Sequence, residues 1–266
     1  MWWETAILGL VQGLTEFLPI SSSGHLLLLQ KFTNLSDFGL AFDAFLHLGT
    51  LLAVLIYFRK DIFSLFTGLF DKNDKLNKKV LLIILLSIMP AGLVGFLAKD
   101  FISNDLRLPG LVLFNLVFWA LIMWWADNYI EKKQNQLIDL SELNWKQGLI
   151  IGLAQVLSLL PGTSRSGITI TAGLFQSLSR SLAARFSFIM SIPLIAAAGL
   201  LNLIELIKQP EEFIILNISI GFLTSFISGY FAIAWFLKIL TNKNLKIFVW
   251  YRLILGFILF IFNYLV

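Results

Sequence analysis

A carboxylate, an imidazole and a run of hydroxyls stand in an otherwise apolar stretch near the start of the chain, where residues 9–25 read GLVQGLTEFLPISSSGH. Ionisable groups in such surroundings are costly and are therefore candidates for function. Gln12 and Glu16 lie four residues apart and share one face of a helix. Their oxygens could form part of a cage for a hard divalent cation. Glu16 could instead act as a general base, or it could simply be neutralised by a structural partner such as Arg165.

A second polar stretch, in which residues 161–169 read PGTSRSGIT, supplies the cation that the first one lacks, Arg165. The guanidinium fork of arginine matches phosphate oxygens, and the free N–H groups at a helix start bind anions. Two such turns brought together would form a pocket for a phosphate or a diphosphate. The alternative is that the serines only cap helices and that Arg165 extends to the membrane interface.

Other polar residues have weaker claims to a role. His25 follows the serine run and could act as a base, an acid or a nucleophile, although a lone histidine in an apolar setting is often only a hydrogen-bonded part of the core. Asp43 and His47 could line the entrance of a site or simply reflect the polarity of a helix end. Arg180 and Arg185 are expected to anchor the chain at the cytoplasmic interface.

The composition indicates a polytopic membrane protein. The 266 residues are 58% hydrophobic and only 14% charged, with a mean hydropathy of +0.84, whereas soluble domains are about one quarter charged. The absence of cysteine excludes disulfides and thiolate metal sites, and two histidines argue against a histidine-rich metal site. We attribute the net charge of +4 to membrane orientation and expect no nucleic-acid partner. No cleavable signal peptide is evident, because the start of the chain lacks a basic region.

The apolar runs predict an all-α fold with six transmembrane helices. A bilayer-spanning helix needs roughly 20 apolar residues, and the candidates are residues 40–58, 80–98, 109–130, 182–206, 213–237 and 246–265. Two further apolar stretches, 5–30 and 147–178, are interrupted by Pro, Gly and hydroxyl residues. Membranes tolerate such interruptions only where the turn is buried in protein or lines a wet cavity. We therefore predict that both are re-entrant helix–loop–helix hairpins.

The basic residues predict how the chain is oriented. Most of them fall in the segments 59–79, 131–146 and 238–246, which we treat as loops, whereas 99–108 and 207–212 carry fewer. Loops rich in Lys and Arg stay in the cytoplasm. The alternation works only if hairpin 5–30 enters from outside and hairpin 147–178 from inside, with both termini external.

Those opposite entries suggest an inverted-topology repeat within one membrane domain. Five residues of the first hairpin recur with the same spacing in the second: Gly9, Gln12 and the unit Ser21-x-Ser23-Gly24 correspond to Gly152, Gln155 and Ser164-x-Ser166-Gly167. Repeat 1 would cover about 1–131 and repeat 2 about 146–266. Inverted repeats form their polar site near the midplane, where broken helices from both halves meet.

The same architecture is typical of secondary transporters, so a transporter or lipid flippase is the competing interpretation. The combination of Glu16, Ser22, His25 and Arg165 favours phosphoryl chemistry instead, since a carrier needs no nucleophile.

Two ordered motifs resemble a known family. The stretch from Gln12 and Glu16 through Phe-Leu-Pro-Ile-Ser-Ser-Ser-Gly-His resembles the first signature of the undecaprenyl-diphosphate phosphatases, the bacitracin-resistance type of bacterial inner-membrane enzyme. Pro161 to Thr169 is similar to the second. The resemblance implies hydrolysis of undecaprenyl diphosphate to undecaprenyl phosphate and inorganic phosphate, which recycles the carrier lipid of cell-wall synthesis. It also implies dependence on a divalent cation, magnesium or calcium, and an active site open to the outer, periplasmic face.

The resemblance also implies roles for individual residues. Gln12 and Glu16 fall on the acidic motif, in which Gln is an accepted variant, and are the metal candidates. Ser22 falls on the hydroxyl proposed as nucleophile, His25 on the motif histidine and Arg165 on the phosphate-binding arginine. Ser23 stands where Thr is more usual, which preserves the hydroxyl. Further phosphate contacts would come from Ser21, Ser23, Gly162, Thr163, Ser164, Ser166 and Thr169.

Two mechanisms fit these residues. Ser22 could attack the terminal phosphorus, with Glu16 or His25 taking its proton, and water would then release phosphate from the seryl intermediate. Alternatively, water attacks directly and Ser22 only positions the phosphate. The partners expected are a polyprenyl diphosphate lipid and the bilayer. The sequence leaves the oligomeric state open, a homodimer included.

Overall fold

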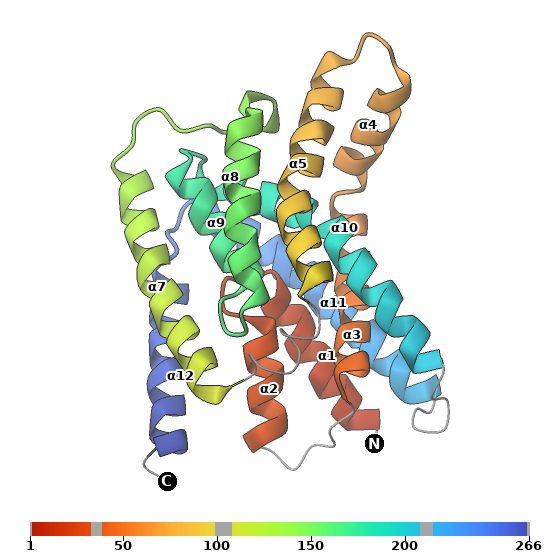
Figure 1. Cartoon of the computed structure of the whole chain (residues 1–266), viewed down its shortest axis with the longest axis vertical. Helices are drawn as coiled ribbons and strands as arrows, with labels where there is room; N and C mark the ends of the chain where they lie inside the picture. Colours follow the sequence, from red (N-terminus) through yellow and green to blue (C-terminus); the bar gives the residue numbers. More distant parts are fainter. Residues whose placement is uncertain (1, 33–38, 99–107, 208–214, 265–266) are drawn as a thin grey trace.

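The computed structural model describes residues 2–32, 39–98, 108–207 and 215–264, and these residues are largely helical. In this part of the chain the one bridge between extended segments joins Leu137 to Leu178. Figure 1 shows the helices packed side by side in one bundle, most of them running roughly along its long axis. In chain order they are α1 (Trp2–Glu16), α2 (Ser22–Phe32), α3 (Gly39–Tyr57), α4 (Arg59–Phe70), α5 (Lys75–Leu97), α7 (Pro109–Glu131), η1 (Leu140–Glu142), α8 (Trp145–Val156), η2 (Leu157–Leu159), α9 (Arg165–Phe175), α10 (Arg180–Ile207), α11 (Ile215–Leu240) and α12 (Lys246–Tyr264).

Within the described residues, four helices are long and apolar enough to cross a bilayer, which agrees with a polytopic membrane protein. Their candidate spans are Lys75–Leu97, Gly110–Glu131, Arg180–Leu200 and Leu216–Leu240. The predicted spans 40–58 and 246–265 correspond to α3 and α12. Within α3, the apolar segment Phe45–Tyr57 is shorter than a full span.

Residues 59–79 are not a simple loop as predicted, because Arg59–Phe70 forms the helix α4. Its outward face carries phenylalanines, among them Phe63 and Phe70, which are 68% and 75% exposed. Helix α4 has 12 residues, too few to span a bilayer, which takes about 20. The charged residues at its start made the segment look like a loop in the sequence.

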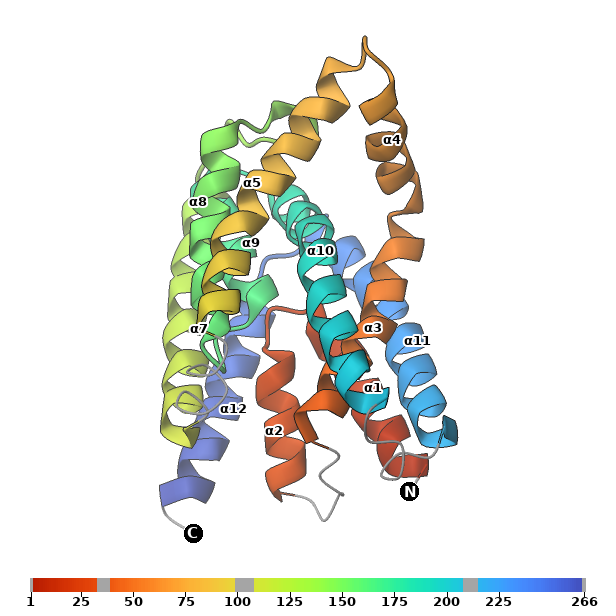
Figure 2. The same ribbon diagram turned by 45° about the vertical axis from the view of Figure 1, so that its right-hand side comes forward.

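Each of the two interrupted stretches folds back on itself. The first consists of α1, a turn at 17–21 and α2; the second consists of α8, η2, a turn at 160–164 and α9. We call them the first and second hairpin. Figures 1 and 2 show the two turns approaching each other inside the bundle, the first hairpin from the end where α1 begins and the second from the end where α4 lies.

The two turns share one feature, a serine with a positive φ angle that caps the following helix. Ser21 and Ser164 have φ angles of 75° and 74°, in the left-handed region that non-glycine residues rarely adopt. Each serine hydroxyl accepts a hydrogen bond from the backbone N–H three residues later, Gly24 N at 3.3 Å and Gly167 N at 3.1 Å. These contacts satisfy one of the free N–H groups at the start of α2 and of α9.

Close helix contacts hold the first arm of each hairpin. A Cβ atom built on Gly9 would lie 2.3 Å from the carbonyl oxygen of Gly221 in α11. A Cβ atom on Gly152 would lie 2.2 Å from the carbonyl oxygen of Ser87 in α5. Small residues let helix backbones approach this closely in membranes. Helix α1 is therefore fixed against α11, and α8 against α5.

The basic segments gather toward one end of the bundle. Helix α4, the start of α5, the start of α8 and the connection from α11 to α12 all lie toward the same end, whereas α1 begins and α12 ends at the other (Figures 1 and 2). Many large apolar side chains of the long helices face outward, for example Phe96, which is 80% exposed. An outward apolar surface of this kind is suited to lipid.

Candidate active site

The turns of the two hairpins bring Glu16, Ser22 and Arg165 together. Glu16 ends α1, Ser22 begins α2 and Arg165 begins α9. One guanidinium nitrogen of Arg165, Nη2, donates to Glu16 Oε1 over 2.8 Å, and the Ser22 hydroxyl donates to Glu16 Oε2 over 2.8 Å. The Glu16 side chain is 7% exposed and that of Arg165 is 16% exposed. The carboxylate, the hydroxyl and the cation selected from the sequence therefore lie in one largely buried site.

Gln12 lies one turn before Glu16 on the same face of α1, as expected. Its Nε2 donates to Glu16 Oε2 over 3.1 Å. The side chain is fully buried, and its Oε1 has no hydrogen-bond partner in the described part of the chain. An unpaired buried oxygen beside a carboxylate is a place where a ligand atom, a water or an ion would be stabilised.

His47, whose role the sequence left open, lies against the same carboxylate. Its Nε2 is 3.4 Å from Glu16 Oε2, and its Nδ1 is 2.9 Å from the carbonyl oxygen of Asp43. A carbonyl only accepts, so Nδ1 carries a hydrogen. Helix α3 thus adds a third nitrogen group, after those of Arg165 and Gln12, to the surroundings of Glu16. The spacing of Asp43 and His47 on one helix was visible in the sequence, but their distance from Glu16 depends on how α3 packs.

Ser21 and Ser23 take different positions in the first turn. Ser21 is buried and caps α2, and its hydroxyl lies 3.5 Å from that of Ser23. The side chain of Ser23 is exposed. Of these two candidate phosphate contacts, Ser23 is thus the one with an accessible hydroxyl, whereas Ser21 mainly shapes the turn.

In the second turn, most candidate hydroxyls bind to protein atoms. Ser164 caps α9, and its hydroxyl lies 3.2 Å from that of Ser166. The Ser166 hydroxyl donates to the carbonyl oxygen of Leu18 over 2.9 Å and so connects the two turns. Thr169 Oγ1 donates to the carbonyl oxygen of Arg165 and lies 2.7 Å from the hydroxyl of Ser187.

Thr163 and Gly162 complete the second turn. The Thr163 hydroxyl is buried and has no hydrogen-bond partner among the described residues, so it is free to bind a ligand oxygen. Gly162 has a φ of +89°, and a Cβ atom there would lie 2.4 Å from the carbonyl oxygen of Val112. Only glycine fits at this point of the turn.

His25 lies outside this cluster. Its Nδ1 is 2.7 Å from the carbonyl oxygen of Ser21, and its Nε2 is 2.6 Å from the hydroxyl of Tyr251 in α12. The two rings also stack, with centroids 5.6 Å apart. Since Nδ1 faces a carbonyl, it carries the hydrogen, and Nε2 accepts from the tyrosine hydroxyl. In the part of the chain that the structure describes, no hydrogen bond joins His25 to Ser22 or Glu16, so this geometry favours Glu16 as the base for Ser22.

One charged residue beside the two turns, Arg252 of α12, was not anticipated from the sequence. Its side chain is 1% exposed, and its guanidinium donates to five backbone carbonyl oxygens over 3.0–3.3 Å: those of Pro19, Asn115, Leu116, Gly162 and Thr163. The signal that could have found it is the one applied to Glu16, an ionisable residue inside an apolar run. Tyr251, next to it, was not anticipated as a partner of His25 either.

Arg180 and Arg185, which we expect to anchor the chain at the cytoplasmic interface, both form ion pairs. Arg180 Nε lies 2.6 Å from Asp127 Oδ1, a carboxylate that is fully buried. Arg185 pairs with Asp61 of α4. These pairs join α10 to α7 and to α4, and their residues make none of the contacts that surround Glu16.

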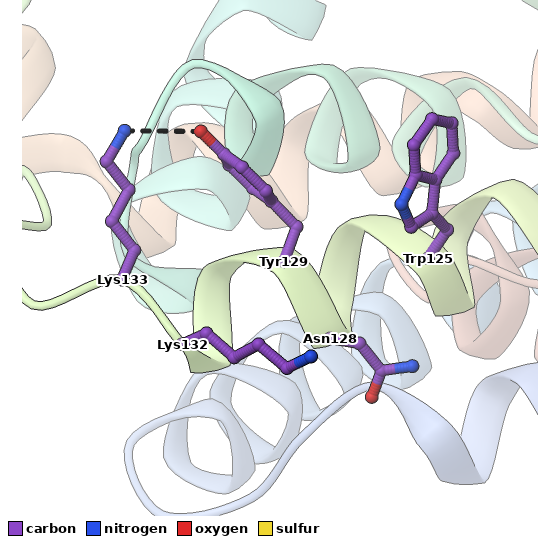
Figure 3. A pocket seen from close by; sticks show the side chains of 5 residues that line it. All are labelled: Trp125, Asn128, Tyr129, Lys132 and Lys133. Atoms are coloured by element: carbon purple, nitrogen blue, oxygen red, sulfur yellow. Dashed lines mark hydrogen bonds between the residues drawn. The ribbon is translucent and has the colours of Figure 1, made fainter.

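A depression of about 440 Å³ lies at the end of α7, well apart from this cluster. Figure 3 shows its five lining residues, with Tyr129 and Lys133 joined by a hydrogen bond. They are Trp125, Asn128, Tyr129, Lys132 and Lys133. Aromatic residues beside lysines are typical of a membrane–water interface, and none of the candidate site residues lines this depression.

The oxygen ligands fit a divalent cation only in part. The described residues contain no group of three His, Cys, Asp or Glu side chains that could hold a metal ion by themselves. Gln12 Oε1 is unpaired among the described residues, and Glu16 Oε1, which accepts one described hydrogen bond, from Arg165, has a lone pair to spare. Magnesium commonly takes one or two protein oxygens and completes its shell with water and substrate phosphates. Gln12 and Glu16 match that limited requirement.

Together these groups suit the chemistry of a phosphoric anhydride. A hydroxyl that donates to a carboxylate can lose its proton to it on attack. Arg165 and the N–H groups at the start of α9 provide positive charge for phosphate oxygens. The negative charge of Glu16 comes from the first hairpin and the positive charge of Arg165 from the second, so the site forms only where the two turns meet.

Comparison with known proteins agrees with this chemistry. A sequence model of the family described as bacitracin resistance protein BacA matches residues 5–258. A curated relative from Stutzerimonas stutzeri (strain A1501), named undecaprenyl-diphosphatase 2, is 42% identical over 262 residues, which cover 97% of each chain. The matched region includes both turns and the part of α12 that contacts them.

Proposed function

The chain belongs to the family of the bacitracin resistance protein BacA, and from this premise we propose that it is an undecaprenyl-diphosphate phosphatase. It hydrolyses undecaprenyl diphosphate to undecaprenyl phosphate and inorganic phosphate, recycles the carrier lipid for cell-wall synthesis and so confers bacitracin resistance. The observation that carries the proposal is the contact of Glu16 with both the Ser22 hydroxyl and the Arg165 guanidinium, each at 2.8 Å.

The proposed reaction begins with Ser22. Its hydroxyl attacks the terminal phosphorus while Glu16, already its hydrogen-bond acceptor, takes the proton. The bond between that phosphorus and the bridging oxygen breaks, and undecaprenyl phosphate leaves with the proton that Glu16 had taken, so Glu16 is a carboxylate again. Water then attacks the seryl phosphate with Glu16 as base, the bond between phosphorus and Ser22 Oγ breaks, and Ser22 recovers its proton from Glu16 as inorganic phosphate leaves. Arg165 and the N–H groups at the start of α9 stabilise the charge on the phosphate oxygens throughout.

The remaining candidates support these three residues. Thr163 and Ser23 supply hydroxyls to the phosphates, and Ser21, Ser164, Ser166 and Thr169 shape the two turns. His25 lies beside the cluster and is held in place by its hydrogen bond with Tyr251. A divalent cation, magnesium or calcium, would be held by Gln12 and Glu16, and it would neutralise charge on the diphosphate. The alternative to attack by Ser22 is direct attack by water, with Ser22 only positioning the phosphate.

We propose that the fold is an inverted-topology repeat of six transmembrane helices and two re-entrant hairpins. Repeat 1 covers about 1–131 and repeat 2 about 146–266. Support comes from the opposite directions from which the hairpins enter the bundle and from the matched serines of the two turns. The basic end of the bundle would face the cytoplasm, which leaves the site open to the outer face of the bacterial inner membrane. A homodimer is one assembly for this chain, and its mass in detergent would test it.

The competing candidate is a transporter or lipid flippase, favoured by one observation: two broken helical segments meet inside the bundle, as in secondary transporters. Transport and hydrolysis make different predictions. A transporter would move labelled lipid across vesicles without releasing phosphate.

The deciding experiment measures phosphate release from farnesyl diphosphate by the purified protein in detergent, with magnesium and with chelator. Glu16→Gln and Arg165→Ala test the two turns separately, and Arg59→Lys is a matched control because the one hydrogen bond described for the Arg59 side chain goes to the carbonyl oxygen of Ile56. Cation-dependent release that both site variants abolish and the control retains is the expected result. Binding of the lipid without any release by the unmodified protein would overturn the proposal in favour of transport.

A further inference from the structure

Arg252 is the largest fully buried side chain in the described part of the chain, and its charge has no carboxylate partner there. Burying an arginine is costly, and a protein usually offsets the cost with an acidic residue. Here the guanidinium donates instead to five backbone carbonyl oxygens. All five N–H donors of an arginine can be used in this way, so none remains to bind a substrate.

The five carbonyl oxygens come from three separate parts of the chain. Pro19 belongs to the turn of the first hairpin, Gly162 and Thr163 to the turn of the second, and Asn115 and Leu116 to α7. Turn carbonyls lack a partner within a helix, and a buried one needs a donor from elsewhere. One guanidinium supplies donors to both turns at once.

The atoms held in this way lie close in sequence to the reacting groups. Pro19 stands midway between Glu16 and Ser22, and Thr163 is two residues before Arg165. Any separation of the two turns would lengthen the contact between Glu16 and Arg165, which spans them. The only other hydrogen bond described between the turns runs from the Ser166 hydroxyl to Leu18. Asn115 adds a tie from α7 by donating to the carbonyl oxygen of Pro161.

We propose that Arg252 is a positioning residue of the enzyme: it joins the turns of the two hairpins so that Ser22, Glu16 and Arg165 meet in reactive geometry. It acts through the turns and touches neither the reacting atoms nor the lipid. The inference rests on the proposed diphosphatase activity. It extends the site beyond the two motifs to a helix at the far end of the chain.

Kinetics separate this role from a general effect on folding. Arg252→Met removes the donors with little change in length, and Arg252→Lys keeps the charge but offers a single nitrogen. Displacement of reacting groups by about 1 Å can lower a rate on the order of 10²-fold. For Arg252→Met we expect a loss of that order in kcat for farnesyl diphosphate, with KM changed by less than about threefold. Arg252→Lys should recover part of kcat, and Arg59→Lys should match the unmodified enzyme.

Chemical rescue covers the case in which Arg252→Met fails to fold. Arg252→Ala leaves a space lined by the same carbonyls, and free guanidinium ion, kept far below denaturing concentrations, should enter it and raise kcat. No rescue would overturn the proposal, as would a folded Arg252→Met variant whose kcat stays within threefold of the unmodified enzyme.

A measurement without substrate distinguishes failure of this inference from failure of the proposed function. The chain contains no cysteine, so Leu160→Cys places a single thiol in the second turn. Its modification by a maleimide should be faster in the Arg252→Met background, because the turns separate. Equal rates would overturn the positioning role. Absence of phosphate release from the unmodified protein would overturn the diphosphatase, and the labelling rates would still report on the turns.

Discussion

The two hairpins have nearly the same turn but carry different chemistry. Ser21 and Ser164 adopt φ angles within one degree of each other and cap their helices in the same way. The next position, the first residue of α2 and of α9, is Ser22 in one turn and Arg165 in the other. The two turns thus have the same backbone conformation at this point. The residue that follows the capping serine determines whether the turn presents a hydroxyl or a cation.

The difference extends into the first arms of the hairpins. Gln12 and Gln155 are both fully buried at matching positions. Gln12 donates to Glu16, but the position matching Glu16 in the second hairpin is Leu159, and both polar atoms of Gln155 lack a partner within the described residues. The first hairpin therefore holds the acid and nucleophile, and the second holds the positive charge. This division predicts which substitutions matter.

The largest effect is expected for Ser22→Ala, which removes the nucleophile of the first turn. Loss of a catalytic nucleophile can lower kcat by about 10⁴-fold or more. The measurement is phosphate release, with Ser158→Ala as the control, since the one hydrogen bond described for the Ser158 hydroxyl goes to the carbonyl oxygen of Gln155. The unmodified enzyme should also yield phosphoserine at position 22 after acid quenching. Substantial turnover by Ser22→Ala without any phosphoenzyme would show that water attacks directly.

Arg165→Ser makes the second turn resemble the first and removes its cation. We expect a loss on the order of 10³-fold in kcat/KM, the size of effect seen when an oxyanion donor is lost. The remaining carboxylate would lie beside the anionic diphosphate with its main partner gone. Activity within tenfold of the unmodified enzyme would contradict the proposed division between the hairpins.

Apolar runs and their interruptions were sufficient to predict the long helices and the two hairpins. The predicted spans 80–98 and 182–206 became Lys75–Leu97 and Arg180–Ile207, which differ by a few residues at their ends. Hydropathy could not reveal α4, because its charged start resembles a loop and its apolar face depends on packing against α5. The six-span count and the repeat boundaries remain predictions.

The grouping of Glu16, Ser22 and Arg165 could be anticipated because motifs of opposite charge occur in two matched stretches. The positions of His47, Tyr251 and Arg252 could not, because they depend on how α3 and α12 pack around the turns. His25 illustrates the limit of sequence proximity: it is three residues after Ser22, yet its ring binds Tyr251 of α12. Proximity along a chain predicts a shared turn and leaves the direction of each side chain open.

Substitution of the two buried amides, Gln12 and Gln155, should have smaller effects, which should differ between the two hairpins. Gln12→Leu should lower kcat by roughly 10- to 100-fold, as is typical when a group that orients a metal-binding carboxylate is lost. Gln155→Leu should retain activity and raise the free energy of unfolding by about 1 kcal/mol, because an unpaired buried amide is replaced by a hydrocarbon. Activity assays and thermal unfolding followed by tryptophan fluorescence measure both. Equal effects of the two substitutions would remove the functional distinction between the arms.

The smallest effects concern the shared turn. Ala at position 21 or 164 loses the cap and retains a Cβ in the left-handed region, whereas Gly loses the cap but relieves the backbone. We expect each Gly variant to be more stable than its Ala counterpart by about 1 kcal/mol. The same ranking should hold at both positions in thermal unfolding. A preference for Ala over Gly at either one would show that the two turns are not equivalent.

The contacts of Gly9 and Gly152 have a consequence for the order in which the molecule is made. Helix α8 finds its partner α5 already synthesised when it leaves the ribosome, whereas α1 packs on α11, which is translated near the end of the chain. Long-range contacts of this kind form late and slowly. The second hairpin can therefore settle first, and the carboxylate of the first reaches its final position only after almost the whole protein has entered the membrane. Nascent chains released before α11 is complete would have both motifs and no finished catalytic centre.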